Sequence, residues 1–99
     1  MSAPQRYEIK RTNRFRKDVE RLKKQGADLH LLEAVVDLLS RTSAPLDAKY
    51  QDHQLKGKEK AFRECHIKDD WLLKYLRDKN TLVLVLTRTG SHQDLFGED

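Results

Sequence analysis

The chain has 99 residues, which is the size of one domain and leaves no room for a second hydrophobic core, so residues 1–99 are expected to form one unit. Lys and Arg number 20 against 16 Asp and Glu, and the net charge of +4 favours nucleic acid, or else an acidic protein, as a partner. The single Cys65 excludes an internal disulfide, and no apolar run resembles a signal peptide or reaches the roughly 18 residues of a membrane span, so we expect a cytoplasmic protein.

One strand and one helix are expected in the first quarter of the chain. Residues 6–11 alternate between apolar and charged side chains, which predicts a short, half-buried strand. Thr12 and Asn13 then offer N-cap oxygens to a helix that ends near Gln25, with Gly26 placed for a C-terminal cap. The helix is highly charged and carries one narrow apolar stripe, made of Phe15, Val19 and Leu22.

A second helix is expected from Asp28, another N-cap residue, to about Arg41, so that the two helices form a hairpin. Its broad apolar face consists of Leu29, Leu32, Val35, Val36 and Leu39. Residues 41–60 follow without a clear period and contain Pro45 and Gly57. A connection of this length in a small domain is usually functional or disordered, and this one carries His53.

Three strands are expected to close the chain, over residues 61–67, 71–77 and 81–89. The turns between them are short, which predicts an antiparallel meander. The element order is therefore β-α-α-β-β-β, an α+β fold in which the first strand joins the meander. The helical hairpin is expected to pack on one sheet face, leaving the other face for solvent or a ligand.

Ionisable and aromatic residues in the sheet half point to chemistry on RNA. His53, His66 and His92 can exchange protons near neutral pH. Cleavage of RNA needs a base for the 2′-hydroxyl, an acid for the leaving 5′-oxygen and a cation for the phosphate, while aromatic rings can hold unstacked bases. Four further residues complete that set without a metal: Asp70, Arg88, Trp71 and Phe96.

Each of these residues also has a structural interpretation. His66 alternates with Glu64 on a predicted strand and could face solvent, whereas Trp71 alternates with apolar residues and could belong to the core. His30 on the second helix is expected to be structural. Cys65 and His66 are adjacent on a strand and point to opposite faces, and no metal-ligand spacing or glycine-rich phosphate loop is present, so neither kind of site is expected.

Three ordered motifs give the chain a family resemblance. They are D-H-x-L at residues 52–55, H-x-x-x-D-W at residues 66–71 and R-T-G-[ST]-H-x-x-L-F at residues 88–96. Each motif alone is weak, but the ordered set resembles the YafQ branch of the RelE/ParE superfamily of bacterial toxins over nearly the whole chain. The resemblance implies a type II toxin that cuts messenger RNA in the ribosomal A site, by metal-independent acid/base catalysis and without a cofactor.

The resemblance also implies roles for individual residues. His92 would be the first candidate for proton transfer, and Arg88 would stabilise the scissile phosphate. The implied catalytic set is His53, His66, Asp70, Arg88 and His92. Bases would be held by Trp71 and Phe96. Phosphate contacts are expected from the basic residues that follow His53, namely Lys56, Lys58 and Arg63.

The partners that the resemblance implies are the 70S ribosome with its messenger RNA and a cognate antitoxin. Toxin and antitoxin would form a heterotetramer that binds operator DNA through the antitoxin, and the acidic residues Glu98 and Asp99 are candidates for antitoxin contact. Two alternatives stay open. The chain could be a ParE-like gyrase inhibitor on the same fold, or a non-catalytic RNA-binding module that uses the same basic loop and aromatic residues.

Overall fold

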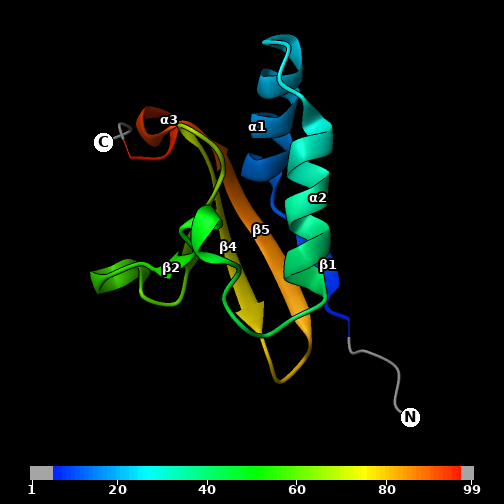
Figure 1. Ribbon diagram of the computed structural model, residues 1–99, viewed down its shortest axis with the longest axis vertical. Helices are drawn as coiled ribbons and strands as arrows, with labels where there is room; N and C mark the ends of the chain where they lie inside the picture. Colours follow the sequence, from blue (N-terminus) through cyan, green and yellow to red (C-terminus); the bar gives the residue numbers. More distant parts are fainter. Residues whose placement is uncertain (1–5, 97–99) are drawn as a thin grey trace.

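The computed structural model describes residues 6–96, and its elements confirm the α+β fold expected from the sequence (Figure 1). The main elements are β1 (Glu8–Arg11), α1 (Asn13–Lys24), α2 (Leu29–Ser40), β3 (Arg63–Lys68), β4 (Trp71–Asp78) and β5 (Val83–Gly90). The connection from α2 to β3 contains the 3-10 helices η1 (Ala48–Tyr50) and η2 (Gly57–Glu59), with the short strand β2 (His53–Gln54) between them. A last helix, α3 (His92–Phe96), follows β5. Glu98 and Asp99 lie outside the described residues.

The strands form one five-stranded mixed sheet in the order β1-β5-β4-β3-β2. Strands β3, β4 and β5 make the expected antiparallel meander, and β2 adds to its outer edge. The first strand joins the sheet as expected, where it runs parallel to β5 and pairs with it only as far as Leu86. Helix α1 begins directly after β1, so it continues along the last part of β5 (Figure 1).

Both predicted helix N-caps are present. Thr12 Oγ1 accepts a hydrogen bond from the Phe15 N–H at 3.0 Å, and Asp28 Oδ1 accepts one from the His30 N–H at 3.1 Å. Each cap satisfies a backbone donor that the first turn of a helix leaves unpaired. Between the caps, α1 ends at Lys24 and the chain turns at Gly26, whose φ of +81° suits glycine. None of the helices within residues 6–96 has the length and apolar character to cross a bilayer.

The hydrophobic core lies between the helical hairpin and one face of the sheet (Figure 1). Phe15 of α1 and Leu39 of α2 pack against residues of the central strands such as Leu73 and Tyr75. Leu39 is fully buried, so its replacement by alanine would cost about 2–5 kcal/mol. With one face of the sheet covered in this way, the histidines on β2 and β3 are carried on the opposite side.

Candidate active site

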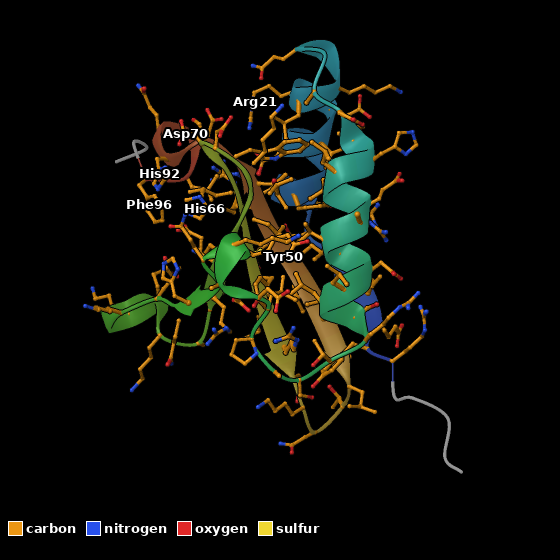
Figure 2. The ribbon with its side chains drawn as sticks, viewed as in Figure 1. Arg21, Tyr50, His66, Asp70, His92 and Phe96 are labelled. Atoms are coloured by element: carbon orange, nitrogen blue, oxygen red, sulfur yellow. The ribbon has the colours of Figure 1, made fainter. Side chains whose placement is uncertain are left out.

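The predicted site residues His66, Asp70, His92 and Phe96 meet where β3, β4 and α3 come together (Figure 2). The ring centres of His66 and His92 are 5.8 Å apart in an edge-on arrangement, and those of His92 and Phe96 are 6.2 Å apart. Asp70 Oδ1 accepts hydrogen bonds from both His92 Nδ1, at 2.5 Å, and the His92 backbone N–H, at 3.0 Å. The turn before β4 and helix α3 are therefore joined through one carboxylate.

His53 reaches the same side of the sheet from β2, where it pairs with Glu64 of β3. Its Nε2 lies 3.7 Å from Glu64 Oε1. Glu64 is only 3% exposed, and its second carboxylate oxygen has no hydrogen-bond partner among the described residues. Burial raises the pKa of Glu64, while the positive charge available at His53, His92, His66 and Lys74 lowers it only in part. The three histidines thus surround a buried carboxyl group.

All three histidines are held through the same ring nitrogen. Nδ1 of His53 lies 2.7 Å from the Gln51 carbonyl oxygen, and Nδ1 of His66 lies 3.1 Å from the Asp69 carbonyl oxygen. A carbonyl oxygen can only accept, so each Nδ1 carries a proton and donates it. The Asp70 carboxylate imposes the same tautomer on His92. Nε2 is therefore the nitrogen with which each neutral ring can take up a proton.

The backbone near two of these histidines adopts an unusual conformation. Gln51 and Asp69 have φ values of +49° and +36°, in the left-handed region that non-glycine residues seldom occupy. These are the two residues whose carbonyl groups hold His53 and His66. Strained backbone of this kind persists where the surrounding structure requires it, often at a functional site.

Asp70 has the electrostatic character of a permanently charged partner. Hydrogen bonds from the backbone and the ring of His92 lower the pKa of Asp70 below 3.8. Because the carboxyl group is exposed to solvent, desolvation raises this pKa only slightly. The group is therefore a carboxylate throughout the neutral range and cannot itself donate a proton to a substrate. It fixes the position and the tautomer of His92.

Arg88 and Trp71 occupy enclosed positions beside the histidines. The Arg88 side chain is 13% exposed, and its Nε donates to Asp18 Oδ2 at 2.8 Å. Arg88 Nη2 also reaches the backbone carbonyl of Asp94 in α3, at 3.4 Å. The Trp71 indole N–H donates to Thr89 Oγ1 at 2.9 Å, and the ring packs against the core. These contacts hold both side chains in fixed positions beside the site.

The three basic residues expected to contact phosphate are separated by the structure. Lys56 and Lys58 are exposed around η2, on the arm that projects from the sheet beside β2 (Figure 1). Arg63 instead lies on the face of β3 opposite Glu64 and His66, because alternate residues of a strand point to opposite sides. Its Nε lies 3.1 Å from Asp52 Oδ1 and 3.3 Å from the Tyr75 hydroxyl. That pairing favours a structural role for Arg63.

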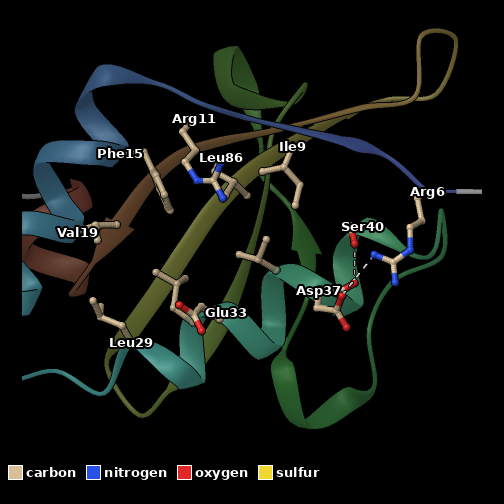
Figure 3. A pocket seen from close by; sticks show the side chains of 12 residues that line it. Arg6, Ile9, Arg11, Phe15, Val19, Leu29, Glu33, Asp37, Ser40 and Leu86 are labelled. Atoms are coloured by element: carbon tan, nitrogen blue, oxygen red, sulfur yellow. Dashed lines mark hydrogen bonds and ion pairs between the residues drawn. The ribbon is translucent and has the colours of Figure 1, made fainter.

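Two hollows in the surface have different relations to the histidines. One of about 360 Å³ lies between α1, α2 and β1, with an apolar lining that includes Ile9 and Phe15 and a rim that carries the Arg6–Asp37 ion pair (Figure 3). It contains none of the predicted site residues. The other, of about 480 Å³, is bordered by His66 and by Tyr50 and runs between α2, η1 and the end of β3. This second hollow extends the histidine site along the surface.

Comparison with known proteins agrees with the three sequence motifs. The family model of the bacterial toxin YafQ of type II toxin–antitoxin systems matches residues 7–97. The chain belongs to the YafQ family. The mRNA interferase toxin YafQ of Escherichia coli K12 is 38% identical over 91 residues, which cover 91% of this chain and 96% of that protein. The resemblance inferred from the motifs is therefore confirmed.

Solved structures of similar proteins share this fold. The E. coli DinJ–YafQ toxin–antitoxin complex contains a chain that is 35% identical, with a TM-score of 0.84 over 93% of this chain and 99% of that one. A metal-bound toxin from Helicobacter pylori is 49% identical, with a TM-score of 0.82 over 91% of this chain and 99% of that one. Within residues 6–96 of the present family member, no group of three or more His, Cys, Asp or Glu side chains has an arrangement that could hold a metal ion.

Glu64 is the member of this YafQ-family site that sequence reasoning did not select. The alternation of Glu64 and His66 correctly placed both on one face of β3, but that face was expected to be open to solvent or a ligand. Glu64 pairs with His53 of β2 and is buried instead. The available signal was the shared face: a carboxylate two residues before a candidate histidine lies beside it on a strand.

Proposed function

We propose that this chain is the toxin of a type II toxin–antitoxin pair and a ribosome-dependent messenger RNA endonuclease. The observation that carries the proposal is the set of three histidines with a common tautomer, grouped around buried Glu64 and completed by Asp70. Membership in the YafQ family supports it, because the E. coli relative is named as an mRNA interferase. Acid/base chemistry near neutral pH is what such a cluster can supply.

The reaction we propose needs no group beyond the RNA and these side chains. One imidazole takes the proton of the 2′-hydroxyl, and the 2′-oxygen attacks the adjacent phosphorus. A 2′,3′-cyclic phosphate forms, the bond to the 5′-oxygen breaks, and a second, protonated imidazole gives that oxygen its proton. His66 and His92 are close enough to act on opposite sides of one phosphate, since their ring centres are 5.8 Å apart. His53, next to Glu64, is a third imidazole that can take up or release a proton during the reaction.

Two residues supply the remaining functions in this proposal. Phe96 is 49% exposed beside His92, so its ring offers a face on which an unstacked base can lie. Arg88 brings positive charge to the base of α3, where it stabilises the charge that develops on the phosphate. Because Asp18 holds its guanidinium, Arg88 acts from a fixed position rather than as a reaching side chain.

Replacing Asp70 with asparagine is expected to lower the cleavage rate by about 100-fold, within the usual range for acid/base catalysis. The amide can present its NH₂ group to His92 Nδ1 and so favour the opposite tautomer. Single-turnover cleavage on programmed ribosomes measures the effect. The adjacent exposed residue gives a matched control, Asp69→Asn, which leaves the His66 contact to the backbone carbonyl intact. Equal rates for Asp70→Asn and wild type would remove Asp70 from the account.

Replacing Lys56 and Lys58 with methionine is expected to weaken ribosome binding and to reduce the salt dependence of the binding constant. Each lost phosphate contact lowers the slope of log K against log salt by about 1. Lys79→Met is the matched control, because Lys79 is equally exposed but lies in the turn between β4 and β5 at the other end of the sheet. Filter binding over a salt range of roughly 50 to 300 mM measures the slopes. Identical slopes for all variants would contradict the assignment.

The proposed function is tested by adding the protein to a translating system and locating cuts in the message by primer extension. Cuts at A-site codons, absent when the same RNA is supplied without ribosomes, are the expected result. A parallel assay of gyrase supercoiling distinguishes the ParE-like alternative, and ribosome binding without cuts would indicate the non-catalytic module. Because the H. pylori relative binds a metal, the experiment should be repeated with a chelator. We expect cleavage by this protein to persist on ribosomes that were prepared with magnesium and then depleted of transition metals.

A cognate antitoxin is the second part of the proposal. E. coli YafQ has been solved in complex with the antitoxin DinJ, and a family member with the same fold is expected to have a corresponding partner. We propose that the pair forms a heterotetramer and binds operator DNA through the antitoxin. Co-expression with the neighbouring open reading frame, followed by measurement of the mass of the complex in solution, tests both the partner and the stoichiometry.

A further inference from the structure

A chain of polar contacts joins α1 to α3 across the end of β5. It starts at Asp18 on α1, which is only 2% exposed. Asp18 accepts hydrogen bonds from Arg88 Nε at 2.8 Å, from Arg21 Nη1 at 2.8 Å and from the Thr89 backbone N–H at 3.0 Å. Burial opposes the ionised form, but these donors together outweigh it and hold the pKa of Asp18 below its usual value. Asp18 is thus a charged anchor.

Arg21 carries the connection from this anchor to α3. Its Nη2 donates to the Thr89 carbonyl oxygen at 3.2 Å and to Asp94 Oδ2 at 3.3 Å. Asp94 Oδ2 also accepts the Ser91 backbone N–H at 2.9 Å, while Ser91 Oγ accepts the Asp94 N–H at 3.1 Å. This reciprocal pair is a capping box at the start of α3. The side chain of Arg21 is therefore bonded to the capping residue of α3, the helix that begins with His92.

Gly90 shows how closely the Arg21–Asp94 contact lies to the backbone. A Cβ atom at Gly90 would lie 2.7 Å from both Arg21 Nη2 and Asp94 Oδ2, and the φ of Gly90 is +151°. Real Cβ atoms do not approach heavy atoms so closely. The Arg21–Asp94 contact therefore passes directly over Gly90, where any side chain would displace the two groups and would need a φ that favours glycine.

Helix α3 depends on such outside contacts for its position. It has five residues, and isolated helices of that length do not form in water. Asp70 holds His92 from the side of β4, through the ring and the backbone N–H. Arg21 holds the same turn from the side of α1, through Asp94. His92 is the first residue of α3, so both clamps determine where its ring lies.

We propose that Arg21 and Asp94 are positioning residues, which hold helix α3 against α1 and so place the His92 ring for proton transfer. The proposal rests on the function proposed above for His92. It goes beyond that function because neither Arg21 nor Asp94 is among the site residues that the three motifs imply. Both side chains are about one-third exposed, so their ion pair contributes little to global stability. Its loss is therefore expected to free α3 without unfolding the protein.

The test compares Arg21→Met, Arg21→Lys and Asp94→Asn with Lys17→Met, at an exposed position on the same helix. For Arg21→Met we expect kcat to fall by about 10- to 100-fold with KM nearly unchanged, because a small misplacement of a catalytic group has effects of that size. Amide exchange of residues 92–96 and the ring resonances of His92, followed by NMR, should change together. Arg21→Lys, which retains the charge, should recover part of both effects. Lys17→Met should resemble wild type.

Two results would overturn the proposal. One is an unchanged His92 spectrum and unchanged exchange in α3 for Arg21→Met. The other is a loss of kcat that follows a fall in Tm and in exchange protection of the whole sheet, which would make Arg21 a general stabilising residue. The NMR readouts do not depend on RNA cleavage. A wild-type protein that cuts no RNA would therefore refute the nuclease while still deciding whether Arg21 positions His92.

Discussion

Replacing His92 with alanine is expected to lower A-site cleavage of messenger RNA by about 10²- to 10⁴-fold, the usual contribution of a general acid or base. Ribosome binding should change little, because the basic residues around η2 stay in place. The reason lies in the position of His92 between His66 and Phe96, with Asp70 fixing its tautomer. Single-turnover rates measured on ribosomes paused at one codon, with binding measured separately, give both quantities.

His30→Ala is the matched control for this experiment. His30 lies exposed on α2, where its ring pairs with Glu33 at 3.4 Å, so it tests the loss of a surface imidazole. Its cleavage rate should equal that of wild type. A His92→Ala protein that cuts at the wild-type rate, or one that binds ribosomes as poorly as it cuts, would contradict the assignment of proton transfer to His92.

Replacing Glu64 with glutamine is expected to have two opposite effects, a more stable protein at neutral pH and slower cleavage. Burial raises the pKa of Glu64, so the ionised carboxylate is less favourable in the folded protein than in the solvated, unfolded chain. The neutral amide avoids that penalty. Cleavage should fall by about 10-fold or more, because His53 loses the charged group with which it exchanges protons.

The pH dependence of the stability gain has a definite sign. A carboxyl group whose pKa is higher in the folded protein than in the unfolded chain makes folding less favourable as pH rises. Below the ordinary pKa of 4.5, Glu64 is protonated in both states and the variant has little advantage. The advantage should grow as pH rises above 4.5 and become constant above the folded pKa. Urea unfolding of both proteins between about pH 4 and pH 8 measures the difference.

Glu33→Gln controls for the loss of a carboxylate on the surface, and its stability difference should show no such pH dependence. A Glu64→Gln protein that is less stable than wild type at pH 8 would mean that Glu64 contributes favourable ion pairing in the fold. Undiminished cleavage by a well-folded Glu64→Gln protein would remove Glu64 from the proposed chemistry.

The parts of the fold that depend on local sequence were predictable. Thr12 and Asp28 cap the helices where the sequence expects them, because a side-chain oxygen at an N-cap acts on donors two or three residues away. The three strands of the meander follow from period-two patterns and short turns. The third begins at Val83 rather than at residue 81, since Leu82 takes up a φ of +55° at the end of the turn.

The parts that depend on distant contacts were not predictable. Helix α3 has no helical period of its own, and its cap is bonded to Arg21, which lies 73 residues away from Asp94 in the sequence. The burial of Glu64 requires β2 to pair with β3. The motifs selected His66, Asp70 and His92 as candidate site residues, and the structure brings these three together. For Arg63, the basic side chain alone could not reveal its pairing with Asp52 on the other face.

If histidines drive attack by the 2′-hydroxyl, the chemical ends of the cut message must show it. RNA cleaved on the ribosome would be purified and the two new ends analysed by mass spectrometry and by labelling with polynucleotide kinase. We expect a 2′,3′-cyclic phosphate on the upstream fragment and a 5′-hydroxyl on the downstream fragment, which the kinase labels directly. A 5′-phosphate on the downstream fragment with a free 3′-hydroxyl upstream would show that water, and not the 2′-oxygen, attacked the phosphate, and would refute catalysis by 2′-hydroxyl attack.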